Sequence, residues 1–257
     1  MSFRWIKASD IESWTNTEAR RAQELLPLIV RKLIIASIPL VSIKDLHFPC
    51  GDSVQYTGFD GRTNIDVGNL YVPNGFSIWE TGTDENILSK ANEDFNKRTS
   101  DSLGVEPANS TFVFVTSRRW KHKTEIMEWI SEKKALNYWK DVRLIDANDL
   151  ETWLELCPAV VLWLAGEMKI FSNKGIKTLT QFYEDWTDVT EPRINEKLIL
   201  KGRDESLNKI TKWLESGVSD LYISADSKDE SLLFFIASVN STDEKIKEAV
   251  LSTSLVI

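Results

Sequence analysis

The chain of 257 residues has few of the features that mark secreted proteins, proteins with a structural zinc site, or membrane proteins. Its two cysteines, Cys50 and Cys157, lie far apart, and neither belongs to a CxxC motif or has a histidine at ligand spacing. This argues against a disulfide framework and a structural zinc site. No run of 18 apolar residues occurs, and the N-terminal stretch MSFRWIKASDIES has no apolar signal core. We therefore expect a cytoplasmic protein with reduced thiols that does not span a membrane.

An excess of positive charge is also missing. The 31 Lys and Arg residues are outnumbered by 39 Asp and Glu residues, which gives a net charge of −8. A protein that coats nucleic acid through its whole surface needs the opposite balance, so any contact with nucleic acid must be local. By contrast, the hydrophobic content of 42% and the 10 tryptophans are sufficient for a large buried core.

The apolar pattern predicts alternating strands and helices in the first part of the chain. Residues from Ala22 to Ile34 repeat with the period of a helix, in which Pro27 is expected to produce a kink or mark the effective start. Strands are expected at 43–49, 57–61, 76–80, 112–115 and 142–145, and further helices at 85–98, 123–134, 149–156 and 158–164. This order predicts an α/β domain at residues 1–170 with a central mixed sheet flanked by helices.

Three residues in this pattern favour phosphodiester chemistry. Asp60 ends one predicted strand in an Asp-Gly turn, Glu80 ends the next strand, and Lys90 lies on the polar face of the helix that follows. Two carboxylates on neighbouring strands repel each other unless a cation joins them, and their oxygens suit Mg²⁺ or Mn²⁺. Such an ion lowers the pKa of a bound water, while an ammonium orients that water and offsets developing negative charge.

Each of these residues also has an ordinary structural explanation. Asp-Gly is common in turns, an acid at a strand end can simply face water, and lysines on a polar helix face are usually solvated. Asp66 is a second possible metal ligand, because IDVG can also end a strand, and we rank it below Asp60. The order of the three residues, rather than any one of them, predicts the site.

That order of helix, strand, Asp, strand, Glu, helix and strand resembles the PD-(D/E)XK restriction-endonuclease-like superfamily. More narrowly, WETGT, SKANEDFNKRT, FVFVTSRRW and DLETWLELCPAVVLWLAGEM resemble the N-terminal nuclease effectors of large bacterial antiphage proteins of the STAND NTPase type. The resemblance covers about residues 1 to 170. It implies a metal-dependent DNA endonuclease in antiviral defence, with Asp60 and Glu80 as the metal ligands.

The chain departs from this family at one position. The lysine usually found two residues after the glutamate is Gly82 here, so the resemblance requires Lys90 to supply the ammonium from the helix. If Lys90 does not do so, the resemblance implies an inactive nuclease fold. In this superfamily an acid of the early helix often supports the metal site from behind the ligands, a part that Glu24 or Glu18 would take.

Basic residues outnumber acidic ones between Arg118 and Lys140, directly after a predicted strand beside the expected site. Such a cluster suits contacts with phosphate groups. The residues expected to contact nucleic acid are Lys97, Arg98, Arg118, Arg119 and Lys121. Trp120 could stack on a base, but packing into the core is the favoured interpretation because tryptophan is mostly buried.

The remainder is expected to be a connector at 171–195, with a short helix at 179–186, and the start of a second α/β domain at 196–257. Strands are predicted at 198–200 and 221–225, and helices at 204–215 and after a capping box formed by Ser227 and Glu230. The position is that of a degenerate P-loop NTPase domain, but ADSKDES lacks the glycines of a phosphate loop, so no ATP site is expected. The final residues, VLSTSLVI, are expected to form a strand of a truncated domain whose downstream sensor is missing.

Three functions are compatible with these observations. The first is a metal-dependent endonuclease effector that becomes active when several copies assemble, which implies a homo-oligomer. The second is a catalytically inactive nuclease-like module that binds DNA or a protein, suggested by Gly82. The third is an assembly or regulatory fragment, suggested by the acidic net charge and the unfinished end.

Overall fold

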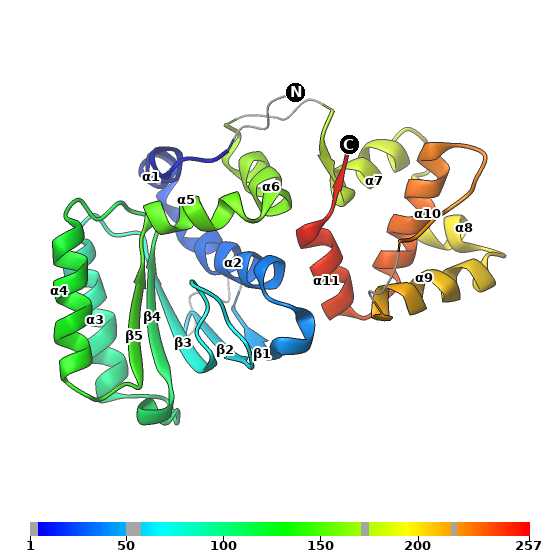
Figure 1. The fold of residues 1–257 in the computed structure, drawn as a ribbon. Helices are drawn as coiled ribbons and strands as arrows, with labels where there is room; N and C mark the ends of the chain where they lie inside the picture. The colour runs from blue at the N-terminus through cyan, green and yellow to red at the C-terminus, as the bar shows by residue number, and fades with distance from the viewer. Residues whose placement is uncertain (1–4, 50–57, 171–174, 217–219) are drawn as a thin grey trace. The chain divides into compact units, whose positions relative to one another are not determined.

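The computed structural model describes residues 5–49, 58–170, 175–216 and 220–257. The chain divides into two compact units, Met1–Lys169 and Ile170–Ile257, which we describe separately (Figure 1). In the described ranges, none of the helices combines the length and the apolar character that crossing a bilayer requires. Cys50 and Thr57 lie outside these ranges, and the expectation that Asp60 ends a strand at 57–61 is wrong, because residues 58–60 form no strand and the strand begins at Gly61.

The first unit is built on a mixed sheet of five strands in the order β1-β2-β3-β4-β5. The strands are β1 (Ile43–His47), β2 (Gly61–Ile65), β3 (Gly75–Gly82), β4 (Thr111–Thr116) and β5 (Asp141–Ile145). The first three are antiparallel to their neighbours, whereas β3, β4 and β5 run parallel. The predicted α/β fold with a mixed sheet flanked by helices is confirmed.

Helices cover both faces of this sheet (Figure 1). One face carries α1 (Ala8–Thr17), α2 (Ala19–Ser37), α5 (Ala147–Glu155) and α6 (Pro158–Met168), and the other carries α3 (Ile87–Ser100) and α4 (Lys123–Ala135). Single turns of 3₁₀ helix lie at Leu40–Ser42 and Pro107–Asn109. Because side chains alternate along a strand, successive residues of β3 point to opposite layers.

Helix α2 has the apolar face that the sequence predicts, with Leu25, Ile29 and Leu33 all buried. The expectation that Pro27 marks the start of this helix is wrong, because α2 begins at Ala19 and continues past the proline. The tertiary contacts of the buried face therefore outweigh the local cost of a proline in the helix interior.

An aromatic cluster fastens α3 and α4 to the sheet. The ring of Phe95 meets Phe112 edge-on at 5.3 Å between centroids and Trp129 at 6.1 Å. All three side chains are buried, so they fix the position of α3 against β4. This matters for the site, because α3 carries Lys90.

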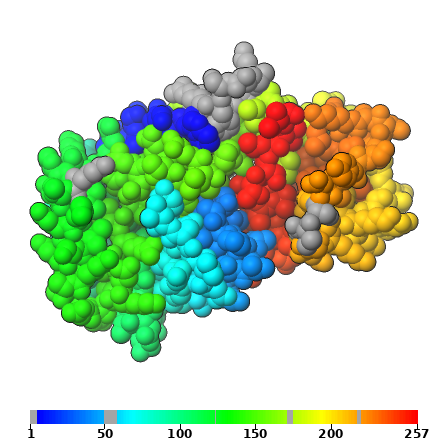
Figure 2. Space-filling view, viewed as in Figure 1, coloured from blue at the N-terminus to red at the C-terminus, as the bar shows by residue number. Residues whose placement is uncertain are grey.

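The long loop between β2 and β3 is held down at several points. Tyr71 donates to Thr152 of α5 at 3.0 Å, and Asn69 donates to the backbone of Ser37 at the end of α2 at 3.3 Å. In the space-filling view this segment, in cyan, covers the surface between those helices (Figure 2). The loop therefore fixes the connection between the two strands that carry the candidate carboxylates.

The second unit is mostly helical. It contains α7 (Leu179–Thr187), α8 (Glu196–Leu200), α9 (Asp204–Ser216), α10 (Lys228–Asn240) and α11 (Glu244–Thr253), with a two-stranded antiparallel sheet of β6 (Lys177–Thr178) and β7 (Leu255–Val256). The helices expected at 179–186 and 204–215 are present. Ser227 caps α10 as predicted, because its hydroxyl accepts from the backbone N–H of Glu230 at 3.1 Å.

Two strand predictions for this unit are wrong, and a third is confirmed only in part. Residues 198–200 belong to α8, whose first turn is capped by Asn195 accepting from the N–H of Leu198 at 3.0 Å. Residues 221–225 form neither a helix nor a strand in the described part of the chain. The final apolar stretch is mostly α11, and only Leu255–Val256 is a strand, which pairs with β6. A parallel sheet of the P-loop type is therefore not formed by the described residues.

Candidate active site

Asp60 and Glu80 lie at the same end of the β2–β3 pair. Asp60 directly precedes β2, and Gly61 is paired with Trp79, so the two carboxylates extend from adjacent positions on neighbouring strands. Oδ2 of Asp60 accepts two hydrogen bonds of 2.7 Å, one from the backbone N–H and one from the hydroxyl of Thr81. The strand after Glu80 thus fixes the orientation of the Asp60 carboxylate.

Glu80 is buried beneath α3. Only 4% of the residue is exposed, and its Oε1 accepts from Nε of Arg98. Burial and the nearby negative charge of Asp60 raise the pKa of Glu80 to about 8, although the guanidinium of Arg98 opposes the rise. A carboxyl group with a pKa near neutrality, at the end of a strand and beside a second carboxylate, is typical of a functional site.

Lys90 and Asp94 form an ion pair one helical turn apart on α3. Nζ of Lys90 lies 2.9 Å from Oδ1 of Asp94, a residue that is only 3% exposed. Burial lowers the pKa of Lys90, but the hydrogen bond and the charge of Asp94 raise it more, so the net shift is upward from 10.5. Burial also raises the pKa of Asp94 above its ordinary value, against the opposing effect of Lys90.

Gly82 lies directly under the side chain of Lys90. A Cβ atom added at Gly82 would stand 3.0 Å from Cγ of Lys90 and 3.0 Å from Cζ of Phe114. Gly82 is two residues beyond Glu80 on the same strand. The stem of Lys90 therefore passes close to this strand position, and the absence of a side chain at Gly82 leaves room for it.

Asp60, Glu80 and Asp94 form one carboxylate cluster, because the negative charge of Asp60 raises the pKa of both Glu80 and Asp94. Lys90 and Arg98 supply the compensating positive charge. The sequence analysis assigned no role to Asp94. The available signal was its spacing, since it lies one turn after Lys90 and three residues after Ala91 on the buried face of α3.

Arg98 and Arg118 do not occupy the exposed positions that were expected of phosphate-binding residues. Arg98 is 3% exposed, donates to Glu80 and to the carbonyl of Gly58, and lies over the ring of Phe59 at 5.1 Å. Arg118 is 9% exposed and donates to the carbonyl of Thr83 at 2.9 Å. Both guanidinium groups already donate to acceptors inside the protein. The expectation that Arg98 and Arg118 lie on a surface that contacts DNA is therefore wrong.

The other three basic residues are more accessible. Lys97 and Lys121 are exposed, whereas Arg119 forms an ion pair with Glu12 at 2.5 Å. Trp120, which lies among these charges, is buried as the sequence analysis favoured, and its indole N–H donates to Glu125 at 3.0 Å. Of the five basic residues expected to bind phosphate, only Lys97 and Lys121 are exposed and have no acidic partner among the described contacts.

The alternative acids lie elsewhere. Asp66 follows β2 at the end opposite to Asp60, is exposed, and pairs with Lys44 at 2.9 Å. Glu24 pairs with Arg20 at 3.0 Å, and Glu18 is exposed at the end of α1. The structure therefore places none of these three acids in the carboxylate cluster.

The carboxylates of this site suit a metal ion because of the type of atom that they offer as ligands. Among the described residues, no group of three or more His, Cys, Asp or Glu side chains is arranged so as to hold a metal ion. Magnesium, however, is often bound through only one or two carboxylates, with water and substrate phosphate completing its shell. Asp60 and Glu80 are oxygen donors of that kind. Oδ2 of Asp94 is also buried without a hydrogen-bond partner in the described structure.

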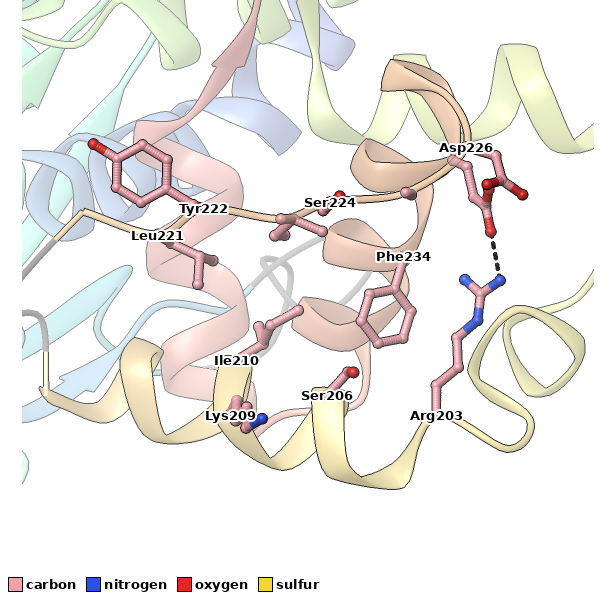
Figure 3. Close-up of a pocket in the computed structure, with 12 residues that line it drawn as sticks. Arg203, Ser206, Lys209, Ile210, Leu221, Tyr222, Ser224, Asp226 and Phe234 are labelled. Atoms are coloured by element: carbon pink, nitrogen blue, oxygen red, sulfur yellow. Dashed lines mark hydrogen bonds and ion pairs between the residues drawn. The ribbon is translucent and has the colours of Figure 1, made fainter.

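A separate cavity of about 450 Å³ lies in the second unit between α9, residues 221–226 and α10 (Figure 3). Arg203 at its edge pairs with Glu230 at 2.5 Å and lies over the ring of Phe234 at 5.3 Å. Lys209 pairs with Glu205 at 2.7 Å. Since these cations already have acidic partners, the cavity does not favour an anionic ligand such as a nucleotide.

Comparison of the chain with protein-family models, with curated proteins and with solved structures found no match.

Proposed function

We propose that the first unit is a metal-dependent endonuclease that hydrolyses DNA phosphodiester bonds, with Asp60 and Glu80 as ligands of Mg²⁺ or Mn²⁺ and Lys90 as the catalytic ammonium. The observation that carries this proposal is the path of Lys90 across Gly82. It accounts for the departure from the family pattern, because the helix supplies the side chain that the strand lacks.

The order of elements supports the same conclusion. Helix α2 precedes three antiparallel strands, Asp60 stands at the start of β2, Glu80 lies near the end of β3, and α3 then leads into the parallel strand β4. This agrees with the order on which the resemblance to the PD-(D/E)XK superfamily rests, except that Asp60 precedes a strand instead of ending one, so that β2 and most of β3 lie between Asp60 and Glu80. Five strands with helices on both faces provide a rigid support for the carboxylates.

Each residue has a definite part in this mechanism. When bound, the metal ion would polarise the phosphate and lower the pKa of the attacking water. Thr81 holds the Asp60 carboxylate in place, and Lys90 offsets the negative charge that develops on the phosphate. Arg98 contacts the carboxyl group of Glu80 in the absence of the ion, so metal and guanidinium compete for that group.

The proposed biological setting rests on the family resemblance. It favours DNA as the substrate, a cytoplasmic role in antiphage defence, and activation when several copies assemble, under the control of a sensor domain of the STAND NTPase type. Exposed Lys97 and Lys121 are the residues we propose for contact with the DNA backbone.

Cleavage of plasmid DNA tests the proposal. The parent should cleave with Mg²⁺ or Mn²⁺, and EDTA, Glu80→Gln and Lys90→Met should each abolish cleavage, since removal of one charge-stabilising group costs about 10²- to 10³-fold in rate. Glu93→Gln is the matched control, because Glu93 is an exposed acid on the same helix. A parent that fails to cleave at high concentration with either ion, or a Glu80→Gln variant that cleaves like the parent, would contradict the proposal.

An exchange of positions tests the part of Lys90 more closely. Lys90→Ala removes the ammonium and the stem that crosses Gly82, so the combined variant Gly82→Lys/Lys90→Ala should restore part of the lost rate from the strand. The ring of Phe114, 3.0 Å from the added Cβ, must shift by a few tenths of an ångström to admit it. Rescue is measured as the cleavage rate of the double variant relative to that of Lys90→Ala alone. If the double variant is as inactive as Lys90→Met while its stability is unchanged, a lysine at position 82 does not place its ammonium where Lys90 does.

A second candidate function is an inactive nuclease-like module that binds DNA or protein. The contact of Arg98 with Glu80 favours it, since a guanidinium already neutralises the carboxylate that a metal requires. Titration with Mn²⁺ separates the two functions. Binding of the ion that is lost in Glu80→Gln supports the nuclease, whereas binding of DNA by the parent without any binding of Mn²⁺ supports the inactive module.

A further inference from the structure

The least explained member of the carboxylate cluster is Asp94. Its side chain is buried in α3, and its Oδ1 is 2.9 Å from the ammonium of Lys90. Its second oxygen, Oδ2, is buried without a hydrogen-bond partner in the described structure. A buried carboxylate with one unsatisfied oxygen lowers the stability of a fold, so stability alone does not account for an acid at this position.

The path of Lys90 explains what such an acid can do. The stem of Lys90 crosses the strand above Gly82, and its far end meets Asp94. A lysine stem has four rotatable bonds and does not hold its ammonium at one point unless something restrains it. The beginning of the stem lies close to Gly82, whereas only Asp94 restrains the charged end among the described contacts.

We propose that Asp94 is a positioning residue that holds the Lys90 ammonium at the end of β3, where it acts on the phosphodiester. This inference rests on the function proposed above. A lysine on the strand beside Glu80 would be aimed by the strand backbone itself. A lysine that reaches the same place from a helix lacks that support, and Asp94, one turn further along the helix, replaces it.

The electrostatics of the pair agree with this geometry. Burial lowers the pKa of Lys90, and the hydrogen bond and charge of Asp94 more than reverse that effect. Without Asp94 the burial remains and its compensation is lost. Asp94 therefore raises the pKa of Lys90 and so favours its charged form, which is the form that stabilises a phosphate.

The ammonium protons of Lys90 report on this contact without reference to catalysis. We would measure their exchange with water by ¹⁵N NMR in the full chain, with the exposed Lys97 as an internal reference and Lys90→Arg to assign the signal. Asp94→Asn keeps the size of the side chain but replaces a charge-assisted hydrogen bond with a neutral one, so exchange at Lys90 should become about tenfold faster. Glu93→Gln removes an exposed charge that also raises the pKa of Lys90 but makes no described hydrogen bond to its ammonium, so it should change the exchange far less.

Measurements of kinetics and stability then show whether Asp94 positions Lys90 or only stabilises the fold. Asp94→Asn should lower kcat by about 10²-fold with KM unchanged, as expected when a reacting group is displaced. Its melting temperature should stay the same or rise, and Asp94→Glu should recover part of the rate. Unchanged ammonium exchange, unchanged kcat, or a loss of rate that only follows a loss of stability would overturn the inference. A parent without cleavage would overturn the proposed function, and the exchange measurement would still decide whether Asp94 holds Lys90.

Discussion

At the scale of single residues, Glu80 combines burial, a neighbouring carboxylate and a guanidinium partner. Its pKa of about 8 means that the folded chain holds a proton on this group over a pH range in which an unfolded chain, with an ordinary value of 4.5, does not. The folded state then binds more protons than the unfolded state, so raising the pH through this window lowers the free energy of unfolding. Above about pH 8 the effect levels off, because both states have lost the proton.

A comparison with Glu80→Gln isolates this contribution. In EDTA, the melting temperature of the parent relative to the variant should fall as the pH rises from about 5 to about 8 and stay constant above it. Differential scanning calorimetry at several pH values gives the difference, and Glu93→Gln serves as the reference for general charge effects. A difference between parent and Glu80→Gln that does not change across this range would show that Glu80 is ionised throughout.

The sequence places some residues of the site but not their full surroundings. Asp60, directly before β2, and Glu80 on β3 lie at adjacent positions, and Lys90 lies on α3 near Gly82, because strands and helix turns can be read from local periodicity. Arg98 was assigned to a polar surface, yet it follows Ala91 and Phe95 at the spacing of the buried face. A charged residue on an apolar stripe indicates an internal partner, and only the tertiary structure shows that this partner is Glu80.

At the scale of elements, α3 links the core to the candidate chemistry. Phe95 directly follows Asp94 and anchors this helix through edge-on contacts with Phe112 and Trp129. Any movement of α3 would therefore displace the ammonium from its place above Gly82. The packing of Phe95 and the position of the Lys90 ammonium are therefore mechanically coupled.

Phe95→Ala should show this coupling. Removal of a buried phenylalanine costs about 3–5 kcal/mol of stability, and the remaining structure should hold α3 less firmly. Urea denaturation gives the loss of stability, and cleavage under conditions where the variant is still folded gives the effect on rate. Leu88→Ala on the same helix is the control, since Leu88 is 47% exposed and should cost far less. Equal stability of the two variants would rule out the aromatic anchor.

The success of strand prediction differs between the two units for a physical reason. Strand β4 is buried along its whole length between two paired neighbours, and its run of aromatic and β-branched residues predicts it correctly. Residues 198–200 and 221–225 have similar apolar character, but the described structure gives them no neighbouring strand. A short apolar run becomes a strand only where a sheet supplies hydrogen-bond partners, and local sequence does not contain that information.

At the scale of the whole molecule, the two compact units differ in architecture. The first, Met1–Lys169, contains all five strands of the large sheet, the helices that cover both faces, and the complete carboxylate cluster. The second, Ile170–Ile257, is helical with one small two-stranded sheet. Since every strand of the large sheet finds its neighbours within the first unit, that unit has the size and the closed core of an independent domain.

The fragment 1–169 should accordingly fold by itself. Its thermal or urea unfolding should be a single cooperative transition, and the full chain should show a transition with the same midpoint, because the core of this unit is built from its own residues. Circular dichroism and a two-dimensional NMR spectrum of the fragment measure this directly, and Phe95→Ala within the fragment is the control that should lower the midpoint. A fragment that lacks a cooperative transition, or whose midpoint lies far below that of the full chain, would show that the second unit stabilises the first. In that case the second unit would contribute to the stability of the carboxylate cluster, and the activity of the site would have to be tested in the full chain alone.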